Sequence, residues 1–119
     1  QNGKLHRDND LPALILDEGK FWYKNGKMHR DNDLPAVMMS NGCQGWYKNG
    51  LSHRDNDLPA VINNGAQSWY QNGKLHRDND LPAVINNDGT QLWYQNDKFI
   101  KMINFGLFIV PENYTFALF

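Results

Sequence analysis

Histidine, arginine and aspartate, side chains that serve in acid–base chemistry and metal binding, recur together in the octapeptide HRDNDLPA. This octapeptide occurs four times without change, at residues 6–13, 29–36, 53–60 and 76–83. A catalytic centre needs its residues once, whereas a structural unit needs them in every repeat. The ionisable residues of the four copies are His6, Arg7, Asp8, Asp10, His29, Arg30, Asp31, Asp33, His53, Arg54, Asp55, Asp57, His76, Arg77, Asp78 and Asp80.

Metal binding is one chemistry that these residue types could perform, but their spacing does not favour it. The segment Asp78-Asn79-Asp80 is similar to the start of a calcium loop, but it lacks the Gly and the closing Glu. If every repeat adds two strands, equivalent His residues lie ~10 Å apart. One zinc ion with bonds of ~2.0–2.1 Å cannot join them. We therefore expect no metal and no cofactor, with ion binding inside a single loop left open.

Catalysis is the other chemistry to consider, because His-Arg-Asp also begins the catalytic loop of protein kinases. Here the spacing to a downstream Asn differs, and a Gly-rich phosphate loop and a strand Lys are missing. Ser40 and Ser52 have no fixed His–Asp geometry repeated around them, and the single cysteine, Cys43, lies at an expected turn. The sequence thus predicts no catalytic residue and no enzymatic activity.

A structural role accounts for the repeated residues more simply. Asp and Asn cap backbone amides in tight turns. Each Arg can form a bidentate pair with a carboxylate of its own or the next loop, and each His can donate to a carbonyl or a carboxylate. We expect a repeated structural network in which each exposed pair contributes ~0–1 kcal/mol.

Composition narrows the class of protein. The 119 residues include 12 Lys+Arg and 13 Asp+Glu, so no basic excess favours nucleic acid as a partner. One cysteine excludes an internal disulfide framework. Polar residues and a Pro interrupt the C-terminal apolar run, which therefore does not read as a membrane helix. No signal-peptide pattern follows Gln1, and an intracellular or virion location is favoured.

The elements that carry the octapeptide follow from its period. Successive Trp residues are separated by 24, 23 and 24 residues, and the variation in length falls near a Gly-containing turn. Each repeat reads as a strand (PAVIN), a turn (NDG), a second strand (QLWYQ), and an Asn-Gly hairpin turn with a return limb (KLHR). The predicted fold is all-β: an elongated single-layer antiparallel sheet of tandem 23–24-residue hairpins.

Trp and Tyr are adjacent in the repeats and therefore point to opposite faces of a strand. We expect the Trp row to pack under the connecting loops as core, with an exposed aromatic ladder for a partner as the alternative.

The chain divides into four tandem repeats at residues 1–97, the first incomplete at its N-terminus, and a C-terminal segment. Residues 98–119 align with the repeat at a shift of 24 and are expected to form a degenerate, apolar fifth unit that caps the array. The candidate interaction surface combines this unit with the Trp row: Trp22, Trp46, Trp69, Trp93, Phe105, Leu107, Phe108, Ile109, Phe116, Leu118 and Phe119.

The pattern WYxNGKxHRDNDLPAVI resembles the β-hairpin arrays called MORN repeats (membrane occupation and recognition nexus). It is most similar to the His-Arg-Asp…Pro-Ala variant of giant viruses of amoebae and some bacteria, and the resemblance covers residues 1–97. The resemblance implies an elongated, twisted antiparallel sheet that serves as a scaffold or docking surface without enzymatic activity. It also implies lipid association or dimerisation in some members, and a virion or host-interaction role.

The function that we expect is a non-enzymatic scaffold or protein–protein interaction module that forms a homo-oligomer through its apolar C-terminal unit. Its partner would be a protein or a second copy of the chain, and not nucleic acid. A peripheral lipid-binding module that uses the aromatic rows is the alternative, although the sequence shows neither a basic patch nor an amphipathic helix. Binding of a small ligand or carbohydrate along the Trp row is a weaker third option.

Overall fold

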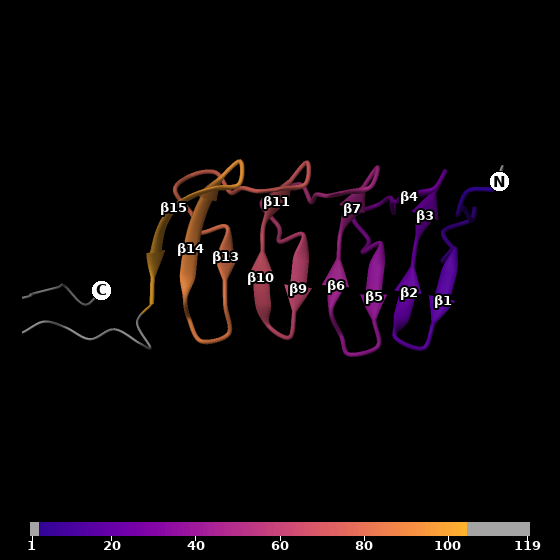
Figure 1. Cartoon of the computed structure of the whole chain (residues 1–119), viewed down its shortest axis with the longest axis horizontal. Helices are drawn as coiled ribbons and strands as arrows, with labels where there is room; N and C mark the ends of the chain where they lie inside the picture. Colours follow the sequence, from indigo (N-terminus) through magenta and orange to yellow (C-terminus); the bar gives the residue numbers. More distant parts are fainter. Residues whose placement is uncertain (1–2, 105–119) are drawn as a thin grey trace, which may run out of the picture.

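A nine-stranded antiparallel sheet dominates the computed structural model, which describes residues 3–104 and has no helix among them. Its hairpins lie side by side along the longest axis (Figure 1), and the molecule measures 65 × 27 × 20 Å. The all-β, elongated fold is therefore as predicted. In spatial order the strands are β1 (Leu14–Leu16), β2 (Gly19–Phe21), β5 (Val37–Met39), β6 (Gln44–Gly45), β9 (Val61–Asn63), β10 (Ala66–Ser68), β13 (Val84–Ile85), β14 (Gln91–Gln95) and β15 (Lys98–Ile103).

Three small two-stranded sheets lie at the same end of their hairpins (Figure 1). An Asn-Gly turn closes each of them, with positive φ at both residues, such as 51° at Asn49 and 85° at Gly50. Only Gly, Asn and Asp adopt this conformation readily, which explains the repeated dipeptide. The strands are β3 (Tyr23–Lys24), β4 (Lys27–Met28), β7 (Tyr47–Lys48), β8 (Leu51–Ser52), β11 (Tyr70–Gln71) and β12 (Lys74–Leu75).

The predicted second strand of each repeat is divided at its Trp in the first three repeats. The Trp22 backbone N–H donates to the Ala36 carbonyl of the next repeat at 2.8 Å, and its carbonyl accepts from the His29 N–H at 3.0 Å. The Trp is thus the point where the chain leaves the main sheet and enters the small hairpin. Only β14 runs through its Trp without a break, with a bulge between Trp93 and Tyr94.

Two rows of side chains run along the main sheet on opposite faces, because neighbouring residues of a strand alternate. One row alternates apolar and long polar side chains: Ile15, Lys20, Met38, Gln44, Ile62, Gln67, Ile85, Gln91 and Ile103. The other row is Leu14, Phe21, Val37, Gly45, Val61, Ser68, Val84, Leu92 and Met102. The core is a line at the junctions between repeats, formed by Trp22, Ala36, Trp46, Ala60, Trp69 and Ala83.

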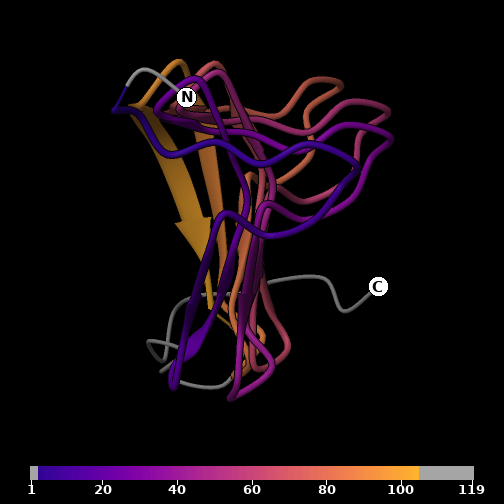
Figure 2. The ribbon, with the colours of Figure 1, turned by 90° about the vertical axis from the view of Figure 1, so that its right-hand side faces the viewer.

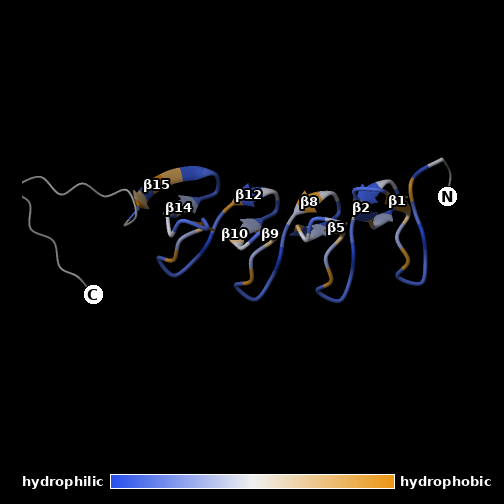
Figure 3. Cartoon of the chain, turned by 90° about the horizontal axis from the view of Figure 1, so that it is seen from below, coloured by the Kyte–Doolittle hydropathy of each residue, from blue (hydrophilic) through white to orange (hydrophobic). Residues whose placement is uncertain are grey.

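The octapeptide loops project to one side of the sheet (Figure 2), and the view from below shows them in a row along the long axis of the molecule (Figure 3). Each loop contains two consecutive residues in the left-handed region, for example Asn32 with φ 64° and Asp33 with φ 55°. Asn and Asp tolerate this region because their short polar side chains bond locally. The Asn-Asp pair is therefore needed to turn the chain back towards the Leu-Pro that precedes each strand.

The C-terminal segment follows the repeat only at its start. Lys98 and Phe99 pair with Gln95 and Tyr94, in the register of the third small hairpin. The segment has no Asn-Asp pair to form a loop, so β15 continues along β14 to Ile103. The remainder of the predicted fifth unit lies outside the described residues, including Phe105, Leu107, Phe108, Ile109, Phe116, Leu118 and Phe119.

Candidate functional site: the network of octapeptide loops

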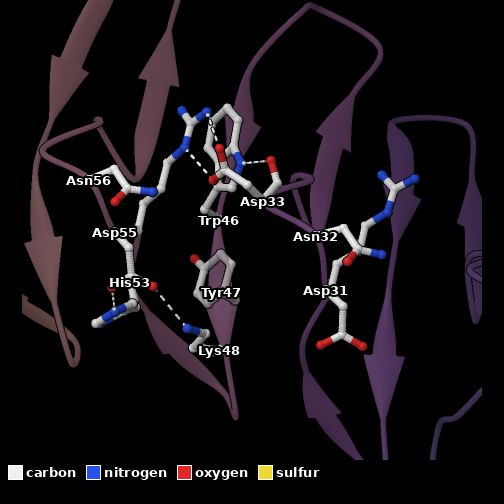
Figure 4. Close-up of a pocket in the computed structure, with 11 residues that line it drawn as sticks. Asp31, Asn32, Asp33, Trp46, Tyr47, Lys48, His53, Asp55 and Asn56 are labelled. Carbon is white, nitrogen blue, oxygen red and sulfur yellow. Dashed lines mark hydrogen bonds and ion pairs between the residues drawn. The ribbon is translucent and has the colours of Figure 1, made fainter.

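The Arg of each octapeptide, from the second copy onward, reaches back to the loop before it. Arg54 donates from Nε to Asp33 Oδ1 at 2.9 Å and from Nη2 to Asp33 Oδ2 at 3.3 Å (Figure 4). The same fork joins Arg30 to Asp10 and Arg77 to Asp57. Bidentate pairs were predicted, but with a carboxylate of the same or the next loop. In the structure Arg30, Arg54 and Arg77 each pair with the preceding loop instead, so each pair joins two successive loops.

Each of these Arg side chains also covers a Trp. The Arg54 guanidinium lies 3.8 Å from the centre of the Trp46 ring, and its Nη1 donates to the Pro59 carbonyl at 3.1 Å. Trp46 in turn donates from Nε1 to the backbone carbonyl of Asp33 at 3.1 Å. Asp33, Trp46 and Arg54 thus contact one another across two repeats, and each of them positions the other two.

The Trp row is core in the first three repeats, because these rings are only 6–7% exposed beneath Arg and loop. This burial does not support the alternative of an exposed aromatic ladder at Trp22, Trp46 and Trp69. Trp93 is only half-buried, and Lys101 lies over its ring at 4.6 Å in place of an Arg.

The His of each octapeptide makes one contact that was predicted and one that was not. His53 Nε2 lies 2.8 Å from Asp55 Oδ1, while Nδ1 accepts the backbone N–H of Asn72 at 3.0 Å. A ring nitrogen that accepts an N–H carries no proton, so this geometry assigns the proton to Nε2, which donates to Asp55. The other loops repeat both contacts, with Asn25 for His6, Asn49 for His29 and Asn96 for His76. Each Asn begins the hairpin turn of the next repeat, which is Asn-Gly except at Asn96-Asp97.

Hydrogen-bond donors on neighbouring side chains favour the ionised form of several loop carboxylates. The hydrogen bond from Arg30 lowers the pKa of Asp10 from its usual 3.8, and that from Arg77 does the same for Asp57. Hydrogen bonds from Lys48 and then His53 lower the pKa of Asp55. These carboxylates therefore act as acceptors that hold neighbouring groups.

Polar clefts lie between successive loops. One of them has a volume of about 490 Å³ and is lined by the second and third loops together with Trp46, Tyr47 and Lys48 (Figure 4). Similar clefts of about 330 and 210 Å³ lie on either side of it. In the part of the chain that the structure describes, no three His, Cys, Asp or Glu side chains are grouped for a metal ion. Successive loops thus form similar polar clefts along the long axis of the sheet.

An exposed apolar strand is the feature that sequence reasoning missed. Phe99, Ile100 and Met102 on β15 are 57%, 53% and 55% exposed. Within the C-terminal unit, the predicted contact residues began at Phe105, although Phe99 and Ile100 occupy the positions of Leu75 and His76 in the aligned repeat. Among residues 3–104, there is no helix long and apolar enough to span a membrane.

Comparison of the chain with models of known families, with curated proteins and with solved structures found no match. The resemblance to MORN repeats therefore rests on the sequence pattern alone. The class of protein that the described residues define is an all-β array of tandem antiparallel hairpins joined by a loop network.

Proposed function

We propose that the chain is a non-catalytic, MORN-like structural module that serves as a scaffold for protein–protein contacts. The observation that carries this proposal is the Arg–Asp fork between successive loops, which uses the repeated ionisable residues to join one unit to the next. Residues bound in this way are positioned for stability rather than for attack on a substrate. A role in a virion or at a host interface is consistent with such a module.

The C-terminal end is the contact surface of this proposal. An edge strand with three exposed apolar side chains is prone to aggregation unless another chain covers it. Among residues 3–104, β15 pairs only with β14 and carries the exposed Phe99, Ile100 and Met102. Residues 105–119, most of which are apolar, follow them in the sequence. A second copy of the chain is the partner that we assign to this end.

Multi-angle light scattering of the whole chain tests the assignment. We expect a mass above that of the monomer, and a monomer when Ile100→Thr and Met102→Thr are combined or when residues 105–119 are deleted. The matched control combines Ile15→Thr and Leu16→Thr, exposed apolar residues on β1, and should keep the oligomer. A monomeric parent chain would refute self-association, and co-sedimentation with anionic vesicles at low salt would favour the lipid-binding alternative.

A further inference from the structure

Asn-Gly dipeptides are chemically reactive as well as suited to tight turns. The backbone nitrogen of the Gly, after losing its proton to solvent, attacks the carboxamide carbon of the Asn, ammonia leaves, and a five-membered succinimide forms. Water then opens this ring on either side and gives Asp or isoaspartate, so the net reaction consumes a water and releases an ammonia. Gly favours the attack because it has no side chain to obstruct the close approach. The sequence contains six Asn-Gly dipeptides, which begin at Asn2, Asn25, Asn41, Asn49, Asn64 and Asn72.

The dipeptides that close the three small hairpins are bound to the preceding repeat. In the third small hairpin, the Gly73 N–H donates to the Ser52 carbonyl at 2.8 Å. The Asn72 N–H donates to His53 Nδ1 at 3.0 Å. The attacking nitrogen of the Gly is therefore held by another repeat, and the turn must open locally before it can react. The other two small hairpins repeat both bonds, at Asn25-Gly26 and Asn49-Gly50.

The turn at Asn64-Gly65 lacks this protection. It joins β9 to β10 at the end of the hairpin away from the small sheets (Figure 1), and both of its residues are exposed. The Gly65 N–H has no hydrogen-bond acceptor among residues 3–104. Asn64 and Asn72 both have φ 52°, so this backbone angle does not distinguish them. The two turns differ in the hydrogen bond of the attacking nitrogen.

The turn at Asn41-Gly42 is held by bonds of its own. The Gly42 N–H donates to the Met39 carbonyl at 3.0 Å. Asn41 Oδ1 accepts the Cys43 N–H at 3.0 Å. Both the attacking nitrogen and the carboxamide are therefore engaged at this turn, whereas the nitrogen is not at Gly65. Asn2 lies outside the described residues.

We infer that Asn64 is the preferred site of spontaneous deamidation in the folded chain, and that contacts between repeats protect the turns of the small hairpins. The product carries a new carboxylate at the tip of the third hairpin, and in the isoaspartyl form the backbone of this turn is one carbon longer. The pair of Asn63 with Ala66, which the turn closes, is disturbed first. The octapeptide loops lie at the other end of the hairpin (Figure 1), so their contacts remain. This modification goes beyond the proposed scaffold function and does not depend on it.

Peptide mapping by mass spectrometry, after incubation of the whole folded chain at mildly alkaline pH, tests the inference. We expect Asn64 to react at least about tenfold faster than Asn72, because the bonded turn must first open. In a chain denatured in guanidinium chloride, the two sites should react at similar rates, because the fold no longer distinguishes them. Asn64→Gln is the matched variant, since Gln would have to form a six-membered ring, and it should remove the fast phase of ammonia release.

The variant His53→Ala tests the protection by a neighbouring repeat. It removes the acceptor of the Asn72 N–H and leaves His29, the acceptor of the Asn49 N–H. Deamidation of Asn72 should become about threefold faster, and that of Asn49 should not change. An unchanged rate at Asn72 would overturn the protective role of this contact.

The comparison of Asn64 with Asn72 in the parent chain decides the inference whether or not this variant folds. Equal rates at the two sites in the folded chain would overturn it. A difference that persists in the denatured chain would overturn it as well, because the neighbouring sequence and not the fold would then set the rates.

Discussion

Replacement of Arg54 by Ala is the most informative single perturbation of the loop network. This side chain joins Asp33 of the preceding loop, the ring of Trp46 and the carbonyl of Pro59. Arg7 occupies the same position of an identical octapeptide, but among the described residues it donates only to the Pro12 carbonyl. A comparison of Arg54→Ala with Arg7→Ala therefore separates the contribution of the contacts between loops from the intrinsic effect of losing an Arg side chain.

The expected loss at Arg54 is the sum of three contacts. Stacking on a buried indole contributes about 1 kcal/mol. The fork to Asp33 contributes about 0.5–1 kcal/mol, because that carboxylate is 49% exposed and partly screened by water. The hydrogen bond to the Pro59 carbonyl contributes about 1 kcal/mol. Arg54→Ala should therefore lower the free energy of unfolding by about 2.5–3 kcal/mol, and Arg7→Ala by less than about 0.5 kcal/mol.

Urea denaturation followed by Trp fluorescence and by circular dichroism measures both values, and coincident transitions would show that the array unfolds as one unit. A loss at Arg54 that equals the loss at Arg7 within error would refute the reasoning, because position in the array would then have no effect.

Three further predictions concern the sheet, the His contacts and acid stability. A Cβ at Gly19 would lie 2.6 Å from a backbone oxygen, whereas one at Gly45 would meet a Tyr ring at 3.1 Å. Gly19→Ala should therefore lower the free energy of unfolding, measured by chemical denaturation, by about 1–3 kcal/mol, and Gly45→Ala by clearly less. His53→Ala should abolish the hydrogen-exchange protection of the Asn72 amide, and His53→Asn, which keeps an acceptor near Nδ1, should restore part of it. The hydrogen bond from Arg77 holds the pKa of Asp57 below 3.8, so the stability from this pair should be complete above pH 3.8 and be lost as the pH falls through the lowered pKa. Asp57→Asn should flatten that part of the curve of stability against pH. An unchanged curve would contradict the pairing of Asp57 with Arg77.

The fold was predictable because its signals are local. The Asn-Gly dipeptides require left-handed backbone, and the structure has this conformation at Asn25 and Gly26 in the first complete repeat. The Gly-containing segments, where the repeat length varies, are turns, and the strands on either side of them pair as antiparallel neighbours. Period and turn chemistry together thus define an array of hairpins without any knowledge of side-chain packing.

The pairing within the candidate site was only partly predictable, because the four octapeptides are identical. Nothing in the sequence distinguishes a pair between Asp57 and Arg54 of its own loop from a pair between Asp57 and Arg77 of the next. The structure selects the second pair, since successive hairpins place Arg77 beside the preceding loop. The acceptance of the Asn72 N–H by His53 is also a contact between repeats, and no local pattern indicates it.

The ends of the array were the hardest part to predict, because contacts between repeats stop there. Residues 98–119 align with the repeat at a shift of 24, which places Lys101 at the position of Arg77 in the octapeptide loop, but β15 continues to Ile103 and pairs with β14. A strand needs no special residue to continue, whereas the loop needs two left-handed positions, which Asn and Asp supply in the octapeptide and which this segment lacks.

A double-mutant cycle on Asp57 and Arg77 tests the central claim most directly, namely that the repeated ionisable residues hold successive hairpins together. The cycle compares Asp57→Ala, Arg77→Ala and the combined variant in urea denaturation, and a second cycle pairs Asp57 with Arg54 of its own loop. We predict a coupling energy of about 1 kcal/mol for Asp57 with Arg77 and about zero for Asp57 with Arg54. No coupling in the first cycle, or equal coupling in both, would contradict the account.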